Sequence, residues 1–336
     1  MPINTKITIL AVVFVVVALV FVTFTANNES PTPEPNELVH EKKWGIYALD
    51  LETQKTDLIY SSENKITKIR LSNSGSQLVF AHEFGNSAEC VTEGSPVNLC
   101  QEICSIDVNG ENYKRITNNN FWDLIPCWTE DDSQIVFLSY RETLDLFIMD
   151  ADGSNTVFVY DSGGHDVDLH YSNGKMAFTR DSQIWIINED GTGLTQVTDP
   201  PRAGEWGAAV LPFGDYDPNF NSDGTKIIFE RLVDDETTHG IYEIYMVNVD
   251  GSNETSLTNT RYTQGIASWS HSDEKIVYMV SAIGTEGYYD LYMMNSDGSE
   301  QCNITPDYFP TEFLCQHPIF SKDDSKVFFV GEWYLD

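Results

Sequence analysis

The feature that most constrains this chain is a short sequence unit that recurs six times. It reads SGSQLVF ending at Phe80, DDSQIVF at Phe137, SNGKMAF at Phe178, SDGTKIIF at Phe229, SDEKIVY at Tyr278 and DDSKVFF at Phe329. Each copy joins a polar run of Ser, Asp, Asn or Gly to an apolar run, a pattern typical of a tight turn followed by a short β-strand. Such repetition indicates an array of equivalent structural units.

A second unit alternates with the first and supports the same interpretation. Its copies begin at Ile46, Ile103, Leu146, Ile184, Ile244 and Leu291, and each has Asp or Asn at its fifth position. Two further short apolar segments flank the pair, so each repeat of roughly 40–60 residues contains four strands, as a propeller blade does. We therefore predict an all-β fold, a six-bladed β-propeller of four-stranded antiparallel blades.

The order of the units predicts how the ring closes. From residue 44 the chain begins with the third and fourth strands of a blade, passes through five complete blades and ends with a first and second strand. The sixth blade is therefore predicted to combine residues 316–332 with residues 44–60. This arrangement removes the open sheet edges that invite aggregation.

Three segments, WSHSDEKIVYM, NSDGTKIIFE and DLYMMNSDGSEQCNIT, resemble the repeat of the TolB-like propeller family, a relative of the WD type. The resemblance covers residues 44–333 and implies a six-bladed propeller. The family motif resembles Trp-Ser-Pro-Asp-Gly, and its Pro is absent from every copy in this chain.

The Asp-Ala-Asp-Gly run at 150–153 has two interpretations, a calcium loop or a hairpin turn. An EF-hand loop requires Gly at its sixth position and Glu at its twelfth. Here Gly153 is the fourth residue counted from Asp150, and no Glu follows in register. Because the motif recurs at one place in the repeat, we predict a hairpin turn.

The segment before the repeats has a different composition. Residues 7–26 are apolar and uncharged, which suits one helical crossing of a bilayer. Lys6 precedes this predicted anchor, so residues 1–6 are expected in the cytoplasm and the propeller, residues 44–336, on the extracytoplasmic side of the cell membrane. A cleaved signal that releases a secreted protein is the alternative. Residues 27–43 are Pro-rich, as in a semi-rigid linker.

Charge and cysteine content limit the partners and the compartment. With 52 acidic and 19 basic residues the net charge is −33, which repels phosphate backbones, so no nucleic-acid partner is expected. Six cysteines in an exported chain predict disulfides, and Cys90–Cys100 and Cys302–Cys315 are the favoured local pairs among the 15 pairings. Nothing in the pattern indicates obligate assembly, so we expect a monomer.

Loops that connect successive blades gather at one mouth of a propeller channel and are the default binding surface. In these loops we predict a ligand-binding surface that comprises Trp122, Asp123, Trp206, Asp215, Tyr262 and Tyr308. Aromatic rings among carboxylates stack on sugars or hold basic peptides. Packing of the rings beneath their own loops is the alternative.

The segment HDVDLH at 165–170 suggests a second candidate site. Strand alternation places Asp166, Asp168 and His170 on one side, facing the channel. Together with Asp217 from the next innermost strand they would suit a divalent cation such as calcium. Solvated channel side chains are the alternative, and no cofactor is required by the rest of the sequence.

Catalytic motifs do not single out a reaction. Gly-x-Ser-x-Gly, His-Glu-x-x-His and phosphate-binding Gly loops do not occur in the sequence, and we predict no catalytic residues. The favoured interpretation is a membrane-anchored extracytoplasmic module that binds a protein, peptide or cell-surface glycan. The alternative is a metal-dependent hydrolase or lyase, acting on a lactone, ester or glycan through the channel residues.

Overall fold

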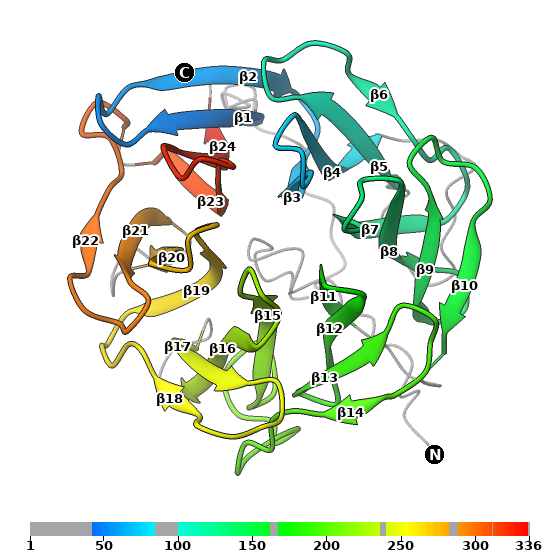
Figure 1. Ribbon diagram of the computed structural model, residues 1–336. Coiled ribbons are helices and arrows are strands. Elements are labelled where there is room, and N and C mark those ends of the chain that lie inside the picture. The colour runs from blue at the N-terminus through cyan, green and yellow to red at the C-terminus, as the bar shows by residue number, and fades with distance from the viewer. Residues whose placement is uncertain are drawn as a thin grey trace, which may run out of the picture.

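A computed structural model of the chain describes residues 42–84, 100–161, 167–235, 240–281, 288–310 and 312–334. Every regular element in these ranges is a β-strand, and the strands form six four-stranded antiparallel sheets. Figure 1 shows the sheets arranged as blades around a common axis. The predicted six-bladed all-β propeller is therefore confirmed.

Five blades are continuous in sequence, and each runs from an innermost to an outermost strand. Blade 1 contains β3 (Ile66–Leu71), β4 (Gln77–Phe84), β5 (Cys100–Asp107) and β6 (Lys114–Arg115). Blade 2 contains β7 (Trp122–Trp128), β8 (Gln134–Tyr140), β9 (Leu144–Asp150) and β10 (Val157–Tyr160). Blade 3 contains β11 (Val167–Ser172), β12 (Lys175–Arg180), β13 (Gln183–Asn188) and β14 (Thr195–Gln196). Blade 4 contains β15 (Asp215–Phe220), β16 (Lys226–Asp234), β17 (Ile241–Asn248) and β18 (Thr255–Ser256). Blade 5 contains β19 (Thr263–Trp269), β20 (Lys275–Ser281), β21 (Asp290–Asn295) and β22 (Cys302–Asn303).

The sixth blade is built from both ends of the described chain, as predicted. From the axis outward it contains β23 (Leu314–Phe320), β24 (Lys326–Tyr334), β1 (Lys42–Asp50) and β2 (Thr56–Ser62). The strand β1 pairs with β24 along its whole length, from Lys42 opposite Tyr334 to Asp50 opposite Lys326. The propeller thus begins at Lys42, inside the segment that the sequence assigned to the linker.

The Asp-Gly motif forms the turn between the third and fourth strands of a blade. The N–H of Ser154 donates to the Asp152 carboxylate at 2.9 Å, and Gly153 has a left-handed φ of 91°. A Cβ atom on Gly153 would lie 2.5 Å from the carbonyl oxygen of Ile116 in the preceding blade. The predicted hairpin turn is confirmed, and its glycine is needed for contact between neighbouring blades.

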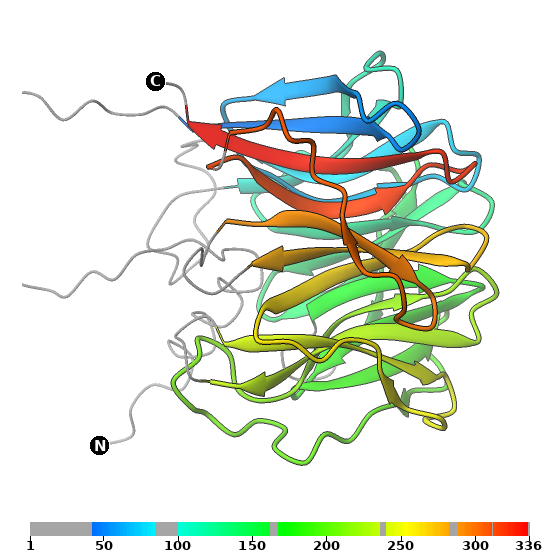
Figure 2. The same cartoon turned by 90° about the vertical axis from the view of Figure 1, so that its left-hand side faces the viewer.

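Turns between the first and second strands connect neighbouring blades. The Asp132 carboxylate accepts hydrogen bonds from the backbone N–H groups of Asn73 and Ser74, at 2.7 and 2.8 Å. Asp324 accepts equivalent bonds from His271 and Ser272, at 2.7 and 2.9 Å. These charge-assisted bonds stabilise one face of the propeller, on the right-hand side of Figure 2.

The cysteine prediction needs a correction. Cys302 and Cys315 are free thiols, because Cys302 is exposed on the outermost strand of blade 5 while Cys315 is buried in the innermost strand of blade 6. Cys104 and Cys127 are also free and buried. The other predicted pair includes Cys90, which lies outside the described residues, as does the anchor predicted at 7–26. Within the described ranges, no helix is long and apolar enough to span a bilayer.

Candidate functional site

The innermost strand of every blade contains a β-bulge at the same position. At each bulge two residues oppose one aromatic residue of the second strand, and the first of the two has a left-handed φ between 47° and 58°. We call these six first residues the bulge ring; they are Lys68, Ile125, Asp168, Asp217, Ile266 and His317. Left-handed φ is an outlier for Ile125 and Ile266, because their side chains are β-branched.

Three members of the bulge ring form a charged layer across the channel. Lys68 on β3 hydrogen-bonds to the Asp217 carboxylate on β15, and its Nζ lies 3.8 Å from Oδ1 of Asp168 on β11. Blades 1 and 4 are opposite one another in a ring of six, so the Lys68–Asp217 contact crosses the axis (Figure 1). The side chains of Lys68 and Asp168 are fully buried and that of Asp217 is 9% exposed.

Glu230 on β16 adds a third carboxylate to this layer. Its Oε2 accepts a hydrogen bond from the N–H of Ile266 at 3.0 Å, and a Cβ on Gly265 would lie 1.7 Å from the same oxygen. The absence of a side chain at Gly265 therefore allows Glu230 to reach this amide. Burial first, and then repulsion from Asp217, raise the pKa of Glu230 well above its ordinary value.

Asp168 is also shifted toward its protonated form. Burial and the neighbouring Asp217 raise its pKa to about 7, and the attraction of Lys68 only partly offsets them. Between its ordinary value of 3.8 and about 7, the folded state binds more protons at Asp168 than the unfolded state does. The contribution of Asp168 to stability therefore falls as the pH rises through this window.

Comparison with Asp168→Asn measures this contribution. The quantity to compare is the free energy of unfolding of the wild type minus that of Asp168→Asn. We expect this difference to decrease from pH 4 to pH 7. Its slope is at most about 1.4 kcal/mol per pH unit, the value for one proton. Four histidines have pKa values that desolvation lowers, and they act in the opposite sense but cancel in the difference; they are His82, His170, His271 and His317. Urea denaturation at four pH values tests this, and a pH-independent difference would contradict it.

A cavity of about 250 Å³ lies where the innermost strands end. Its wall contains the residue two positions after each member of the bulge ring, one from every blade. This pocket ring is Arg70, Cys127, His170, Asn219, Ser268 and Ile319. The rim is formed by the turns that connect neighbouring blades, including Asn73, Ser222 and Lys322. The cavity therefore opens on the face opposite the loops that lead from blade to blade.

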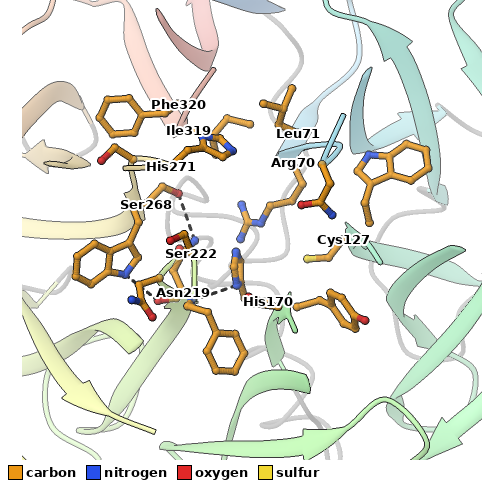
Figure 3. A pocket seen from close by; sticks show the side chains of 18 of the residues that line it. Arg70, Leu71, Cys127, His170, Asn219, Ser222, Ser268, His271, Ile319 and Phe320 are labelled. Carbon is orange, nitrogen blue, oxygen red and sulfur yellow. Dashed lines mark hydrogen bonds between the residues drawn. The ribbon is translucent and has the colours of Figure 1, made fainter. Parts of the chain in front are cut away.

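Arg70 and His170 point toward the middle of this cavity, side by side, in Figure 3. The N–H of Phe220 donates to Nδ1 of His170 at 3.2 Å, so Nε2 carries the ring proton and is a donor. Burial first, and then the charge of Arg70, lower the pKa of His170 well below its ordinary value. The ring is thus neutral at pH 7, and the guanidinium of Arg70 is the charged group of the pair.

Comparisons with known proteins agree with this architecture. No family model matches the chain. Its structure is similar to that of a candidate TolB from Agrobacterium tumefaciens, with a TM-score of 0.61 and 14% identity over 88% of this chain and 99% of the other. The chain thus has a propeller fold similar to that of TolB. TolB from Acinetobacter baumannii gives a TM-score of 0.55 with 16% identity, over 79% of this chain and 65% of that protein.

Two other proteins are similar to this chain. Oligogalacturonate lyase in complex with manganese has a TM-score of 0.53 and 15% identity, over 87% of this chain and 83% of the enzyme. An uncharacterized protein of Agrobacterium fabrum is 22% identical over 165 residues, 45% of this chain and 53% of that protein. The matched part is thus about half the length of this curated relative. Identities this low show a shared fold and nothing of the activity.

Three of the residues predicted to bind a ligand are buried within the propeller. Trp122 is 7% exposed, and Asp123 accepts hydrogen bonds from the side chains of Ser139 and Asn119, both at 2.7 Å. Asp215 forms a bidentate ion pair with Arg231 at 2.6 and 2.8 Å. These contacts give Asp123 and Asp215 structural partners, and the buried ring of Trp122 follows the alternative of packing beneath the loop.

The other three predicted residues are exposed but not all at the channel. Trp206 is 53%, Tyr262 44% and Tyr308 59% exposed. The hydroxyl of Tyr308 accepts a hydrogen bond from the N–H of Thr56 at 2.9 Å, which places it beside the outermost strand β2, at the rim of the molecule. Trp206 and Tyr262 remain predictions for the face with the connecting loops.

The residues predicted to bind a cation occupy two different layers. Asp168 and Asp217 contact Lys68 in the charged layer, whereas His170 lines the cavity. Asp166 lies outside the described residues. Among the residues that are described, no group of three or more His, Cys, Asp or Glu side chains is arranged to hold a metal ion. The cation site stays a prediction, and the ammonium of Lys68 already neutralises part of its charge.

The sequence analysis placed Asp168, Asp217 and His170 at the channel but named no cation beside them. Lys68 and Arg70, which complete the two layers, were not predicted. The signal was available, since Lys68, Asp168 and Asp217 occupy the same position in three copies of the repeat.

Proposed function

We propose that this TolB-like propeller is a binding module that holds a segment of a partner protein in the channel cavity. The observation that carries this proposal is the convergence of side chains from all six blades on one cavity. A preformed concave site with a few polar groups is the usual form of a ligand site. The hydrogen-bonded turns around its rim would keep the site rigid, which reduces the entropy lost on binding.

The enzymatic alternative has less support. A metal-dependent hydrolase or lyase would use the carboxylates of Asp168 and Asp217, and both contact the ammonium of Lys68. The similarity to oligogalacturonate lyase extends to the fold and, at 15% identity, not to a shared set of ligands. We therefore prefer binding to catalysis.

A membrane tether is part of the proposal. The apolar run at 7–26 would anchor the chain, and the linker at 27–43 would separate the propeller from an extracytoplasmic membrane surface. A monomer held in this way is suited to capturing a partner that is itself attached to the cell envelope or surface.

A peptide display library applied to the purified full chain tests the proposal. We expect enriched peptides to bind the wild type and to lose at least about tenfold in affinity with Ser268→Phe, which fills the cavity, or Ser222→Trp, which obstructs its rim. The controls are Trp206→Ala and Tyr262→Ala on the opposite face. Loss of binding in the controls alone would move the site to that face, and absence of enriched peptides would contradict a peptide-binding module.

A further inference from the structure

The cavity contains a cation that has no carboxylate partner among the described residues. Nη1 of Arg70 donates to the carbonyl oxygen of Ile69 at 3.1 Å, and its buried Nε has no hydrogen-bond partner. Four other arginines form ion pairs with Asp or Glu: Arg115, Arg180, Arg202 and Arg231. In a chain with 52 acidic and 19 basic residues, an inward-facing arginine without such a pair is unexpected.

Two further polar groups of the wall are hydrogen-bond donors. Nε2 of His170 carries a proton, as shown by the bond that Nδ1 accepts, and the buried indole N–H of Trp128 has no partner. One carboxylate lines the cavity, that of Glu130, and its Oε2 already accepts a hydrogen bond from the N–H of Asn173 at 3.0 Å. Unpaired donors at a partly buried site favour a ligand that supplies acceptors.

From these groups we infer that the cavity binds a carboxylate of an extended peptide, with Arg70 as the residue that pairs with it. The guanidinium presents a planar fork that matches the two oxygens of a carboxylate, and such bidentate pairs are among the strongest hydrogen bonds in proteins. The inference rests on the proposed function, since it names the chemical group that the binding module recognises.

A glycan acid fits the cavity less well than a peptide does. Sugar recognition uses the open face of an aromatic ring. The rings that line this cavity are packed between blades, and Trp128, Phe220, Trp269 and Phe320 are each at most 8% exposed. They expose too little surface for a sugar to stack on.

A phosphate group also fits less well. The charged layer behind the cavity adds no positive charge for a dianion, because Lys68 is paired with Asp217 and the pKa values of Asp168 and Glu230 are raised. Arg70 is the charged donor of the pocket ring, which suits one negative charge, and the ammonium of Lys322 belongs to the rim.

The test uses the full chain and two unlabelled tetrapeptide amides, Gly-Ser-Gly-Glu and Gly-Ser-Gly-Gln, observed by saturation-transfer NMR. These probes differ in one charge. We expect the Glu peptide to bind at least about tenfold more tightly than the Gln peptide, as charge-assisted bonds imply. Arg70→Met should remove this preference, Arg70→Lys should keep part of it, and Arg261→Met, a matched loss of charge at an exposed residue on the opposite face, should leave it unchanged.

Several results would overturn the inference. These are equal binding of the two peptides, a preference that survives Arg70→Met, no binding of either peptide, stronger competition by inorganic phosphate than by acetate, or tighter binding of trigalacturonate than of the Glu peptide. Thermal unfolding of each variant checks that the fold is intact. A different result would separate the inference from the proposed function. If display peptides bind, if Ser268→Phe blocks their binding, and if their affinity does not depend on acidic residues in the peptide, the inference fails while the proposed function stands.

Discussion

Replacing Lys68 by Met is expected to lower the free energy of unfolding by about 3–5 kcal/mol at pH 8. The substitution keeps the apolar stem of the side chain and removes the ammonium. Asp168 and Asp217 would then be buried beside one another without a cation. Removal of one partner of a buried ion pair is costly because the remaining charge has neither water nor a counterion.

The loss should depend on pH. At pH 5 the carboxylates take up protons more readily without Lys68, so we expect a smaller difference from the wild type than at pH 8. Adding Asp217→Asn to Lys68→Met should recover part of the stability, which gives a non-additive double-mutant cycle. Urea denaturation of the four proteins at both pH values measures these differences.

The control for this experiment is a lysine at the surface. Lys275 lies 3.9 Å from Glu300, and the two side chains are 39% and 75% exposed. An exposed pair contributes at most about 1 kcal/mol, so Lys275→Met should have little effect. Equal losses for Lys68→Met and Lys275→Met would show that the charged layer does not stabilise the channel.

The architecture could be predicted from the sequence because it depends on local patterns. Each aromatic residue that ends the first repeat unit, from Phe80 to Phe329, lies in a second strand and is almost fully buried opposite a bulge. The Asp-Gly turns follow from a backbone conformation that glycine adopts without strain. The order of units then determines the closure, since a blade with two missing strands must obtain them from the other end of the chain.

The bulge ring could not be predicted from local patterns in the same way. Strand propensity predicts a regular strand at Ile125 and Ile266, yet both have left-handed φ. The available signal was proline, because Pro126, Pro218 and Pro318 occupy the second bulge position of three innermost strands. Proline within a strand indicates an edge or a bulge, and the innermost strand of a blade is an edge.

The site residues depended on contacts between distant blades. Lys68 and Asp217 are 149 residues apart, and no local pattern relates them. Loop composition likewise could not distinguish Trp122, which is 7% exposed, from Trp206, which is 53% exposed. Asp215 looked like a loop carboxylate, but it begins β15 and pairs with Arg231 across the neighbouring strand.

Tyr47→Ala is expected to destabilise the propeller by about 3 kcal/mol, because its ring joins the two ends of the chain. Tyr47 lies on β1 and stacks on Phe329 of β24, with ring centroids 5.5 Å apart. It also makes edge contacts with Phe313 at 5.5 Å and Trp333 at 6.0 Å. Truncation to Ala removes these contacts and leaves a cavity that the rigid blade cannot fill by relaxation.

An aromatic residue outside the closure provides the matched comparison. Phe158 is 51% exposed on the edge strand β10 and has an edge contact with Phe147 at 5.5 Å. We expect Phe158→Ala to cost less than about 1 kcal/mol, since little apolar area leaves the core. Urea denaturation gives both values, and amide hydrogen exchange should show faster opening of β1 and β24 in Tyr47→Ala alone. Equal destabilisation by the two variants would mean that the aromatic contacts of Tyr47 do not close the propeller. Backbone pairing between β1 and β24 would then be sufficient for closure.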